Sequence, residues 1–105
     1  MEPFTKRVLS IIHSIPAGYV MTYGQVAKVA GKANGARQVS WILHSMSKKH
    51  QLPWHRIINA KGEISLTGSE QQELLEMEEV RFKQNGKIDL HKYQWMPEIN
   101  ELDKI

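Results

Sequence analysis

Apolar residues recur at helical spacing through the first half of this sequence, and glycine or proline interrupts them at short intervals. The first series runs from Phe4 to Ile15 and is stopped by Pro16-Ala17-Gly18. Each such series can bury one face of a short helix. The pattern therefore predicts a mainly α-helical fold that begins with a core-facing helix over residues 4–15.

Two further short helices are predicted between Thr22 and Met46. Thr22 and Gln25 have the spacing of a capping box, in which each side chain satisfies a backbone amide at the helix start, and Gly31 ends this helix. A third helix follows from about Ala36 to Met46. Two short helices joined by a tight, glycine-containing turn are typical of a helix-turn-helix. The buried stripe predicted for the third helix comprises Val39, Ile42, Leu43 and Met46.

The pattern changes after Leu52. Ile57 and Ile58 favour an extended chain, residues 59–62 have the composition of a turn, and Ile64 begins a return. The sequence therefore predicts a small β-hairpin, loop or wing in this segment.

A fourth helix is predicted over residues 69–84, ended by Asn85-Gly86. The tail over residues 85–105 is too apolar for a purely disordered extension, so we expect at least its first part to pack on the body. Together these elements predict one domain over residues 1–105, with a winged helix-turn-helix DNA-binding body at 4–84 and a packed tail. The apolar residues expected to face inward from the fourth helix are Leu74, Leu75, Met77 and Phe82.

The sequence of 105 residues contains no cysteine. Disulfides, thiolate zinc sites and a thiol nucleophile are therefore excluded. It also shows no charged leader with a cleavage site and no run of 18 apolar residues. We expect a soluble, cytoplasmic protein with no membrane partner.

Positive charge is concentrated in one half of the chain. Residues 1–61 contain nine Lys or Arg and one acid, a sum of +8, whereas residues 62–105 contain five and ten, a sum of −5. A polyanion such as nucleic acid is a sensible partner for the basic half, and the acidic half would face away from it. A solvated surface whose two halves attract one another explains the same asymmetry.

The candidate recognition helix is unusual for a protein that reads the major groove. It opens with Gly35 and Ala36 and carries Ser40 one turn later, a face of small residues that lets a backbone approach DNA closely but reads few base edges. Arg37 is the exception. Its spacing alone favours a simple phosphate contact.

Three motifs resemble those of the O6-alkylguanine-DNA alkyltransferases. The segment Pro53-Trp54-His55-Arg56-Ile57-Ile58 is similar to the Pro-Cys-His-Arg-Val-Val active-site motif of that family, with tryptophan in place of cysteine. Residues 22–27 are similar to the family's tyrosine-containing helix start, and Ala36-Arg37-Gln38-Val39 is similar to its Ala-Arg-Ala-Val recognition helix. The order of these motifs and the intervals between them agree, and the resemblance covers roughly residues 4–82, with an apparent three-residue deletion near Gly68. A Pro-Trp-His-Arg motif on a short chain resembles the alkyltransferase-like proteins in particular.

The resemblance implies that the nucleophile is lost while its supporting residues remain. In the transferases a thiolate attacks the alkyl carbon of a flipped guanine, assisted by a histidine, a water and a glutamate. His55 and Glu78 match the histidine and the glutamate, and Trp54 stands at the nucleophile. An indole has no accessible lone pair for displacement at carbon, so alkyl transfer by this site is excluded. Trp54 either supplies an apolar wall for the alkyl group or is an ordinary core residue.

His55 and Glu78 are expected to form a buried hydrogen-bonded pair that shapes the pocket. Their use as acid and base in a hydrolytic reaction stays open as an alternative. No histidine pair has a recognised metal-ligand spacing, so neither a metal nor a cofactor is predicted. The other histidines considered as ligands beside His55 are His13, His44, His50 and His91.

The mechanism implied by the resemblance is nucleotide flipping. The helix-turn-helix docks in the minor groove, Arg37 fills the space that the base vacates, and Tyr23 pushes on the backbone phosphate. By itself, a tyrosine at a helix start is more often a packing residue. The implied alkylguanine pocket comprises Tyr23, Leu43, Pro53, Trp54, Ile57, Ile64, Thr67 and Gly68, and the implied DNA contacts comprise Tyr23, Ala36, Arg37, Gln38, Ser40 and Arg56.

Two departures from the family pattern bear on the pocket. Met46-Ser47 replaces an Asn-Pro step, which removes any hydrogen bond made by that asparagine. Leu66-Thr67-Gly68-Ser69 replaces an Asn-Tyr-Ser-Gly lid, which removes an aromatic ring. A lid without that ring is compatible with bulky adducts as well as methyl.

The function implied is that of a non-enzymatic damage-recognition protein, a monomer that binds double-stranded DNA containing O6-alkylguanine. A protein that recognises a lesion but cannot repair it must signal the lesion to other proteins. The resemblance to this family implies nucleotide excision repair proteins as those partners. The acidic fourth helix is a docking candidate or simply a solvated face. The alternatives are a small winged-helix transcription regulator and the hydrolytic enzyme that uses His55 and Glu78. The acidic residues of that helix are Glu70, Glu73, Glu76 and Glu79.

Overall fold

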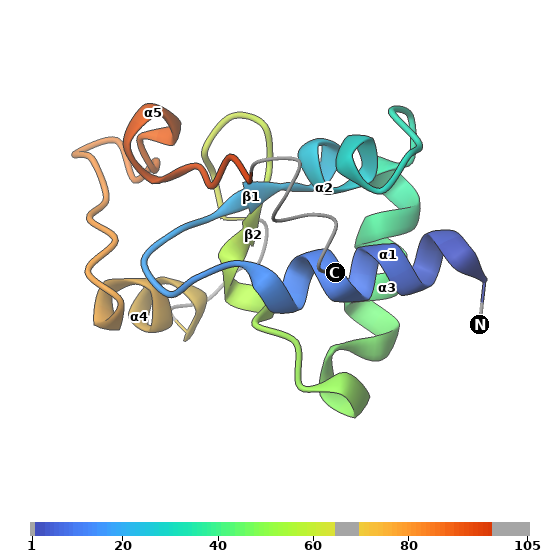
Figure 1. Ribbon diagram of the computed structural model, residues 1–105. Helices are drawn as coiled ribbons and strands as arrows, with labels where there is room; N and C mark the ends of the chain where they lie inside the picture. The colour runs from blue at the N-terminus through green and yellow to red at the C-terminus, as the bar shows by residue number, and fades with distance from the viewer. Residues whose placement is uncertain (1, 65–69, 98–105) are drawn as a thin grey trace.

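The computed structural model describes residues 2–64 and 70–97 (Figure 1). The predicted mainly α-helical fold is confirmed. None of the helices in these two ranges is long and apolar enough to cross a membrane. In chain order the elements are α1 (Pro3–Ser14), β1 (Met21–Thr22), α2 (Tyr23–Val29), α3 (Ala36–His50), the single 3-10 turn η1 (Trp54–Arg56), β2 (Ile57–Ile58), α4 (Glu70–Met77) and α5 (Leu90–Tyr93).

Helices α1, α2 and α3 pack around a first core cluster. The capping box at the start of α2 is confirmed, because the Thr22 hydroxyl accepts from the Gln25 amide N–H at 3.0 Å and the Gln25 side chain accepts from the Thr22 N–H at 3.4 Å. Gly35 precedes α3 in a tight position, since a Cβ there would lie 3.2 Å from Phe4 Cζ. The cluster comprises Phe4, Val8, Leu9, Ile11, Ile12, Ile15, Met21, Val26, Ala27, Ala30, Val39, Ile42, Leu43, Leu52 and Ile57.

Helix α3 continues beyond the predicted end at Met46, as far as His50. It ends at Gln51, which has a left-handed backbone with φ of 51°, and the Leu52 N–H donates to the Ser47 carbonyl at 2.9 Å. Glycine usually occupies this position, so a glutamine there does not predict a helix end. The last turn contains the basic residues Lys48, Lys49 and His50. Positive side chains in this position interact favourably with the negative end of the helix dipole.

The small sheet differs from the predicted hairpin. Strands β1 and β2 pair in parallel, with Met21 opposite Ile57 and Thr22 opposite Ile58, and they lie between the α1–α3 group and the α4–α5 side of the molecule (Figure 1). The turn at residues 59–62 is confirmed by the Gly62 N–H bond to the Asn59 carbonyl at 3.1 Å. The residues of a turn indicate only local structure. They cannot reveal that β2 pairs with β1, some 35 positions earlier, because this pairing is set by the burial of both strands.

Helix α4 is shorter than predicted, because it ends at Met77 rather than near Gln84. Glu79 has a left-handed backbone with φ of 68°, and the Val80 N–H reaches the Leu75 carbonyl at 3.0 Å, which closes the helix end. Met77, predicted to face inward, is 80% exposed.

The Asn85-Gly86 pair forms a turn rather than a helix stop. Phe82 and Ile88 face each other in an antiparallel bridge, and the Lys83 N–H donates to the Lys87 carbonyl at 2.8 Å. An Asn-Gly pair between apolar residues is a strong hairpin signal. The prediction missed it because residues 78–82 continued the apolar spacing of the helix.

The first part of the tail lies against the body. Residue Val20 exchanges backbone hydrogen bonds with Tyr93 and Trp95 at 2.9 and 2.8 Å, which places the tail beside the edge of β1. The tail also contributes to a second core cluster on the other side of the sheet. That cluster comprises Val20, Ile58, Leu75, Val80, Ile88 and Tyr93.

Candidate functional site

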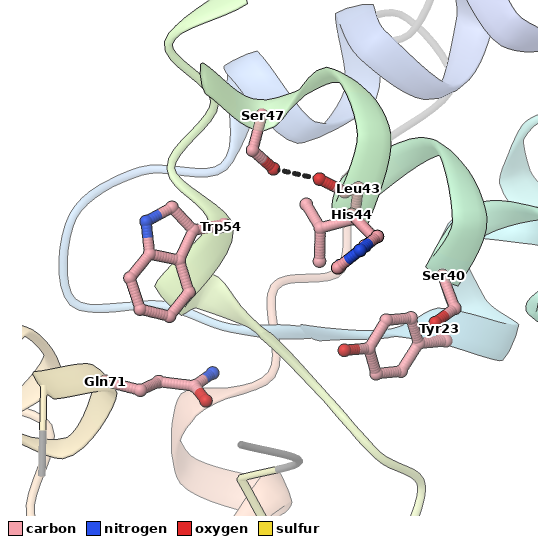
Figure 2. A pocket seen from close by; sticks show the side chains of 7 residues that line it. All are labelled: Tyr23, Ser40, Leu43, His44, Ser47, Trp54 and Gln71. Atoms are coloured by element: carbon pink, nitrogen blue, oxygen red, sulfur yellow. Dashed lines mark hydrogen bonds between the residues drawn. The ribbon is translucent and has the colours of Figure 1, made fainter. Parts of the chain in front are cut away.

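A cavity of about 440 Å³ opens between the start of α2, one face of α3, the η1 turn and α4 (Figure 2). Side chains at spacings of three and four residues along α3 form one wall, because such residues share a helix face. The Trp54 indole stands opposite Tyr23 across the opening, and Gln71 reaches in from below in the view (Figure 2). The lining residues are Tyr23, Ser40, Leu43, His44, Ser47, Trp54 and Gln71.

Trp54 lies between this cavity and a second hollow. Its indole is partly buried against the first core cluster, and it meets the His55 ring edge to face, with centroids 6.1 Å apart and planes at 87°. The second hollow, of about 560 Å³, shares Trp54, His44 and Ser47 with the first. The indole therefore lines both hollows while the first core cluster supports it.

Gln71 fixes the segment that carries Trp54. Its side chain is 2% exposed, and its amide nitrogen donates to the carbonyl oxygens of His55 and Ile57, each at 3.1 Å. These two bonds fix the orientation of the amide and leave Oε1 buried without a partner. An unpartnered buried acceptor at the wall of a cavity requires an explanation, such as a donor on a bound molecule.

Glu78 joins three segments behind Trp54. His55 Nε2 lies 2.8 Å from Glu78 Oε2, as the expected His55 and Glu78 pair requires. Arg56 donates to the same carboxylate from Nε at 2.9 Å and from a terminal nitrogen at 2.6 Å, and it also reaches the Ile15 carbonyl at 2.9 Å. The Gly18 N–H adds a bond to Oε1 at 3.2 Å. The carboxylate thus holds η1 against the loop after α1 and against the end of α4.

These contacts keep Glu78 ionised. Burial alone would raise its pKa, but hydrogen bonds from Arg56, His55 and the Gly18 amide outweigh burial and lower the pKa from 4.5 to about 2. Since the carboxylate carries no proton at neutral pH, His55 Nε2 must be the donor in their shared bond. The tautomer and the orientation of the His55 ring are therefore set by Glu78.

The structure places the implied pocket residues in different surroundings. Tyr23, Leu43 and Trp54 line the cavity, whereas Pro53 lines the second hollow. Ile57 does not line either, because its side chain is fully buried in the first core cluster. Ile64 packs against the second core cluster, and Thr67 and Gly68, with the rest of the expected lid, lie outside the described residues.

The implied DNA contacts are also divided. Arg37 is exposed and Ala36 and Gln38 are half-buried in the first turn of α3, whereas Ser40 lines the cavity. Arg56 was expected to contact DNA, but its guanidinium is directed inward to Glu78 and the Ile15 carbonyl. Its charge is therefore neutralised inside the protein.

Sequence reasoning missed three residues that line the cavity. His44 and Ser47 follow Ser40 and Leu43 at helical spacing, so the periodicity of α3 could have revealed them. Gln71 gave no signal, because a glutamine on a short acidic helix is ordinarily exposed. In the parts of the chain that the structure covers, no three metal-binding side chains come together.

Comparison with known proteins identifies the family. Residues 3–80 match the family model for the 6-O-methylguanine DNA methyltransferase DNA-binding domain. The chain is 45% identical over 97 residues to a DNA base-flipping protein of Escherichia coli, covering 90% of this chain and 75% of the relative. It is 34% identical over 106 residues to alkyltransferase-like protein 1 of Schizosaccharomyces pombe, covering 92% and 98%.

Solved structures agree with this assignment. S. pombe Atl1 in complex with damaged DNA containing O6-carboxymethylguanine matches with a TM-score of 0.79 at 34% identity, covering 92% of this chain and 98% of Atl1. Mycobacterium tuberculosis OGT in complex with DNA matches with a TM-score of 0.60 at 27% identity, covering 75% and 50%. The chain therefore belongs to the family of the 6-O-methylguanine DNA methyltransferase DNA-binding domain, and within it to the alkyltransferase-like proteins.

Proposed function

We propose that this protein binds O6-alkylguanine in double-stranded DNA by flipping the nucleotide into the cavity at Trp54, and that it leaves the alkyl group in place. The observation that carries the proposal is the position of Trp54. It stands on the wall of a preformed cavity, at the motif position of a nucleophile, with the supporting contacts of His55 and Glu78 intact. The names of the relatives, a base-flipping protein and an alkyltransferase-like protein, support the same function.

The cavity suits a flipped base. Its volume of about 440 Å³ lies within the range of roughly 300–1,000 Å³ typical of small-molecule sites. Trp54 and Leu43 give it apolar walls on which an alkyl group loses water, and Tyr23, His44 and Gln71 give it polar edges. An indole that is backed by the core can present its face without having to be ordered on binding.

Helix α3 provides the means of flipping. Arg37 projects from its first turn as an exposed cation and would occupy the space left in the base stack, with Ala36 and Gln38 against the minor groove. Tyr23 begins α2 at the edge of the cavity, where it would meet the phosphate of the rotated nucleotide. Flipping costs a few kcal/mol of unstacking, and this cost is lower at a mispaired adduct.

The contacts of Glu78 count against a hydrolytic reaction. A general base works best when its pKa lies near the working pH, whereas the pKa of Glu78 is about 2 and its carboxylate is ion-paired with Arg56. His55 Nε2 is occupied by the same carboxylate. The pair is suited to holding η1 in place, and the chain has no cysteine to accept an alkyl group.

In the proposed role, the bound protein signals the position of the lesion to other proteins. A protein that retains the lesion would act as a monomeric marker for nucleotide excision repair proteins. The exposed acidic side of α4, with Glu73 and Glu76, is a candidate surface for such a partner.

One binding experiment tests the proposal. Affinity is measured for a duplex with a single O6-methylguanine and for its unmodified twin at the same salt concentration, and the DNA is then digested and analysed for the adduct. Preferential binding with the lesion intact is the expected result. Equal affinity for both duplexes would favour a transcription regulator, and loss of the methyl group or of the base would favour an enzyme.

A further inference from the structure

Trp41 is a large aromatic residue that the core does not use. It lies in the middle of α3 and is 67% exposed, although α3 otherwise buries Val39, Ile42 and Leu43 on its inner face. Exposing an indole to water costs free energy that a folded protein can avoid by placing a polar residue there. One exposed indole does not by itself mark a contact, because single exposed hydrophobic residues are common, so the residues around Trp41 must show whether it has a role.

The neighbours of Trp41 along the helix are basic side chains. Arg37, Trp41, His44 and Lys48 follow one another at intervals of four, three and four residues, so they share one face of α3, and all four are exposed. We call this set the α3 stripe. At 1.5 Å per residue it extends about 16 Å, the length of about five nucleotides at 3.4 Å each. Helix α3 itself contains no acidic residue, and Glu2, the only acid in residues 1–61, pairs with Lys32 at 3.4 Å.

A groove of about 710 Å³ lies beside Trp41. It leads from Trp41 to the N-terminal end of α3, where Arg37 projects, and its other lining residues are polar or small: Lys32, Asn34, Gly35 and Gln38. Lys32 stands at its edge, with its ammonium 4.8 Å from the centre of the Phe4 ring. The groove therefore combines one aromatic face with positive charge, the combination that binds bases and phosphates together. A protein partner would instead be matched by further apolar side chains around the indole.

We propose that Trp41 packs on a nucleotide of the duplex beside the one that faces the cavity, whether or not that nucleotide is damaged, and that the α3 stripe follows the DNA backbone beyond Arg37. This inference rests on the proposed function, since it assigns the DNA surface around the same site. The cavity at Trp54 would select the lesion. Trp41, on the adjoining face of α3 that shares His44 with the cavity wall, would add affinity that does not depend on the lesion, because every base has a face on which an indole can stack.

The test follows the accessibility of Trp41 in the whole protein. Acrylamide quenching of tryptophan fluorescence is measured with and without an unmodified duplex, for the wild type and for Trp41→Phe. We expect DNA to protect a fraction of the wild-type fluorescence and expect this protection to be absent in Trp41→Phe, which retains Trp54 and Trp95. Trp41→Ala should weaken binding to modified and unmodified duplexes by the same factor, roughly tenfold.

The matched control is Met77→Ala, which removes another exposed apolar side chain, 80% exposed, from the acidic helix α4. It should leave both affinities unchanged. If DNA leaves Trp41 fully quenchable, or if Trp41→Ala binds as the wild type does, the inference is overturned even where the lesion preference holds. If Trp41 is protected but the two duplexes bind equally, the proposed function fails and the Trp41 contact stands.

Discussion

At the scale of single residues, the proposed function rests on Trp54, which stands on a cavity wall, and on the bond that ties its neighbour His55 to Glu78. Roles for these residues follow from matching residue types to a motif. Arg56 shows the limit of such matching. An arginine in a basic segment has the same sequence appearance whether it meets a phosphate or a buried carboxylate, and only the fold brings Glu78 to it.

Arg37 tests the proposed insertion into the base stack. Arg37→Ala should weaken binding to the O6-methylguanine duplex by roughly tenfold or more, because the vacated space would be left unfilled. The fold should be unaffected, since the side chain is exposed. Arg81→Ala, which removes an exposed cation from the acidic half, is the control. Equal losses of DNA affinity in the two variants, measured by fluorescence anisotropy, would show that Arg37 acts only as one positive charge among several.

Gln71 tests whether the wall of the cavity is held by its amide. Gln71→Leu has similar volume but leaves the His55 and Ile57 carbonyls without their donor, so the free energy of unfolding should fall by about 1–3 kcal/mol. Gln72→Leu, at the half-buried neighbouring position, should change it by much less. Urea denaturation of both variants gives the comparison, and equal stability would show that the two carbonyls find other donors.

At the scale of elements, the sequence located the helices better than their ends. The start of α2 was predictable because a capping box consists of two residue types at a fixed spacing. The ends of α3 and α4 were not, because Gln51 and Glu79 take the left-handed conformation that glycine normally marks. The pairing of β1 with β2 joins distant segments through burial, and no local signal encodes it.

Two glycines with nearly the same backbone φ allow the cost of a left-handed conformation to be separated from the cost of a steric contact. Gly62 and Gly86 have φ of 81° and 80°, but a Cβ at Gly62 would lie 2.5 Å from the Ile88 carbonyl oxygen, whereas at Gly86 it would meet nothing within 4 Å. Gly86→Ala should therefore cost about 1 kcal/mol for the left-handed conformation alone. Gly62→Ala should cost a further ~1–3 kcal/mol, because the link from Gly62 to Ile88 must open.

Thermal unfolding of the two glycine variants under the same conditions checks this difference. Similar losses would mean that the chain around Ile88 gives way without cost. A larger loss at Gly86 would contradict the predicted order of the two effects.

At the scale of the whole molecule, Glu78 connects the basic and acidic halves. It lies in the acidic half, just after α4, yet its partners Gly18, His55 and Arg56 all belong to the basic half. The charge asymmetry of the sequence predicted an attraction between halves only in general terms. The structure concentrates part of it in one carboxylate with 15% side-chain exposure.

This arrangement predicts a loss of stability in acid. Because the pKa of Glu78 is about 2 in the folded protein and 4.5 without its partners, the unfolded chain takes up this proton first as the pH falls. The contribution of Glu78, roughly 3 kcal/mol from the difference between those pKa values, is complete above about pH 5.5 and is lost progressively between pH 5 and pH 2. Urea denaturation of the wild type across that range measures the loss.

Glu78→Gln isolates the contribution of this carboxylate to the whole fold. The amide cannot ion-pair with Arg56, so the variant should be less stable than the wild type at pH 7, and the two curves of unfolding free energy against pH should converge as the pH falls towards 2. Glu76→Gln, an exposed residue of α4, should run parallel to the wild type. A constant gap between Glu78→Gln and the wild type at every pH would show that the proton is taken up equally by both states. Packing rather than charge would then hold the basic and acidic halves of the protein together.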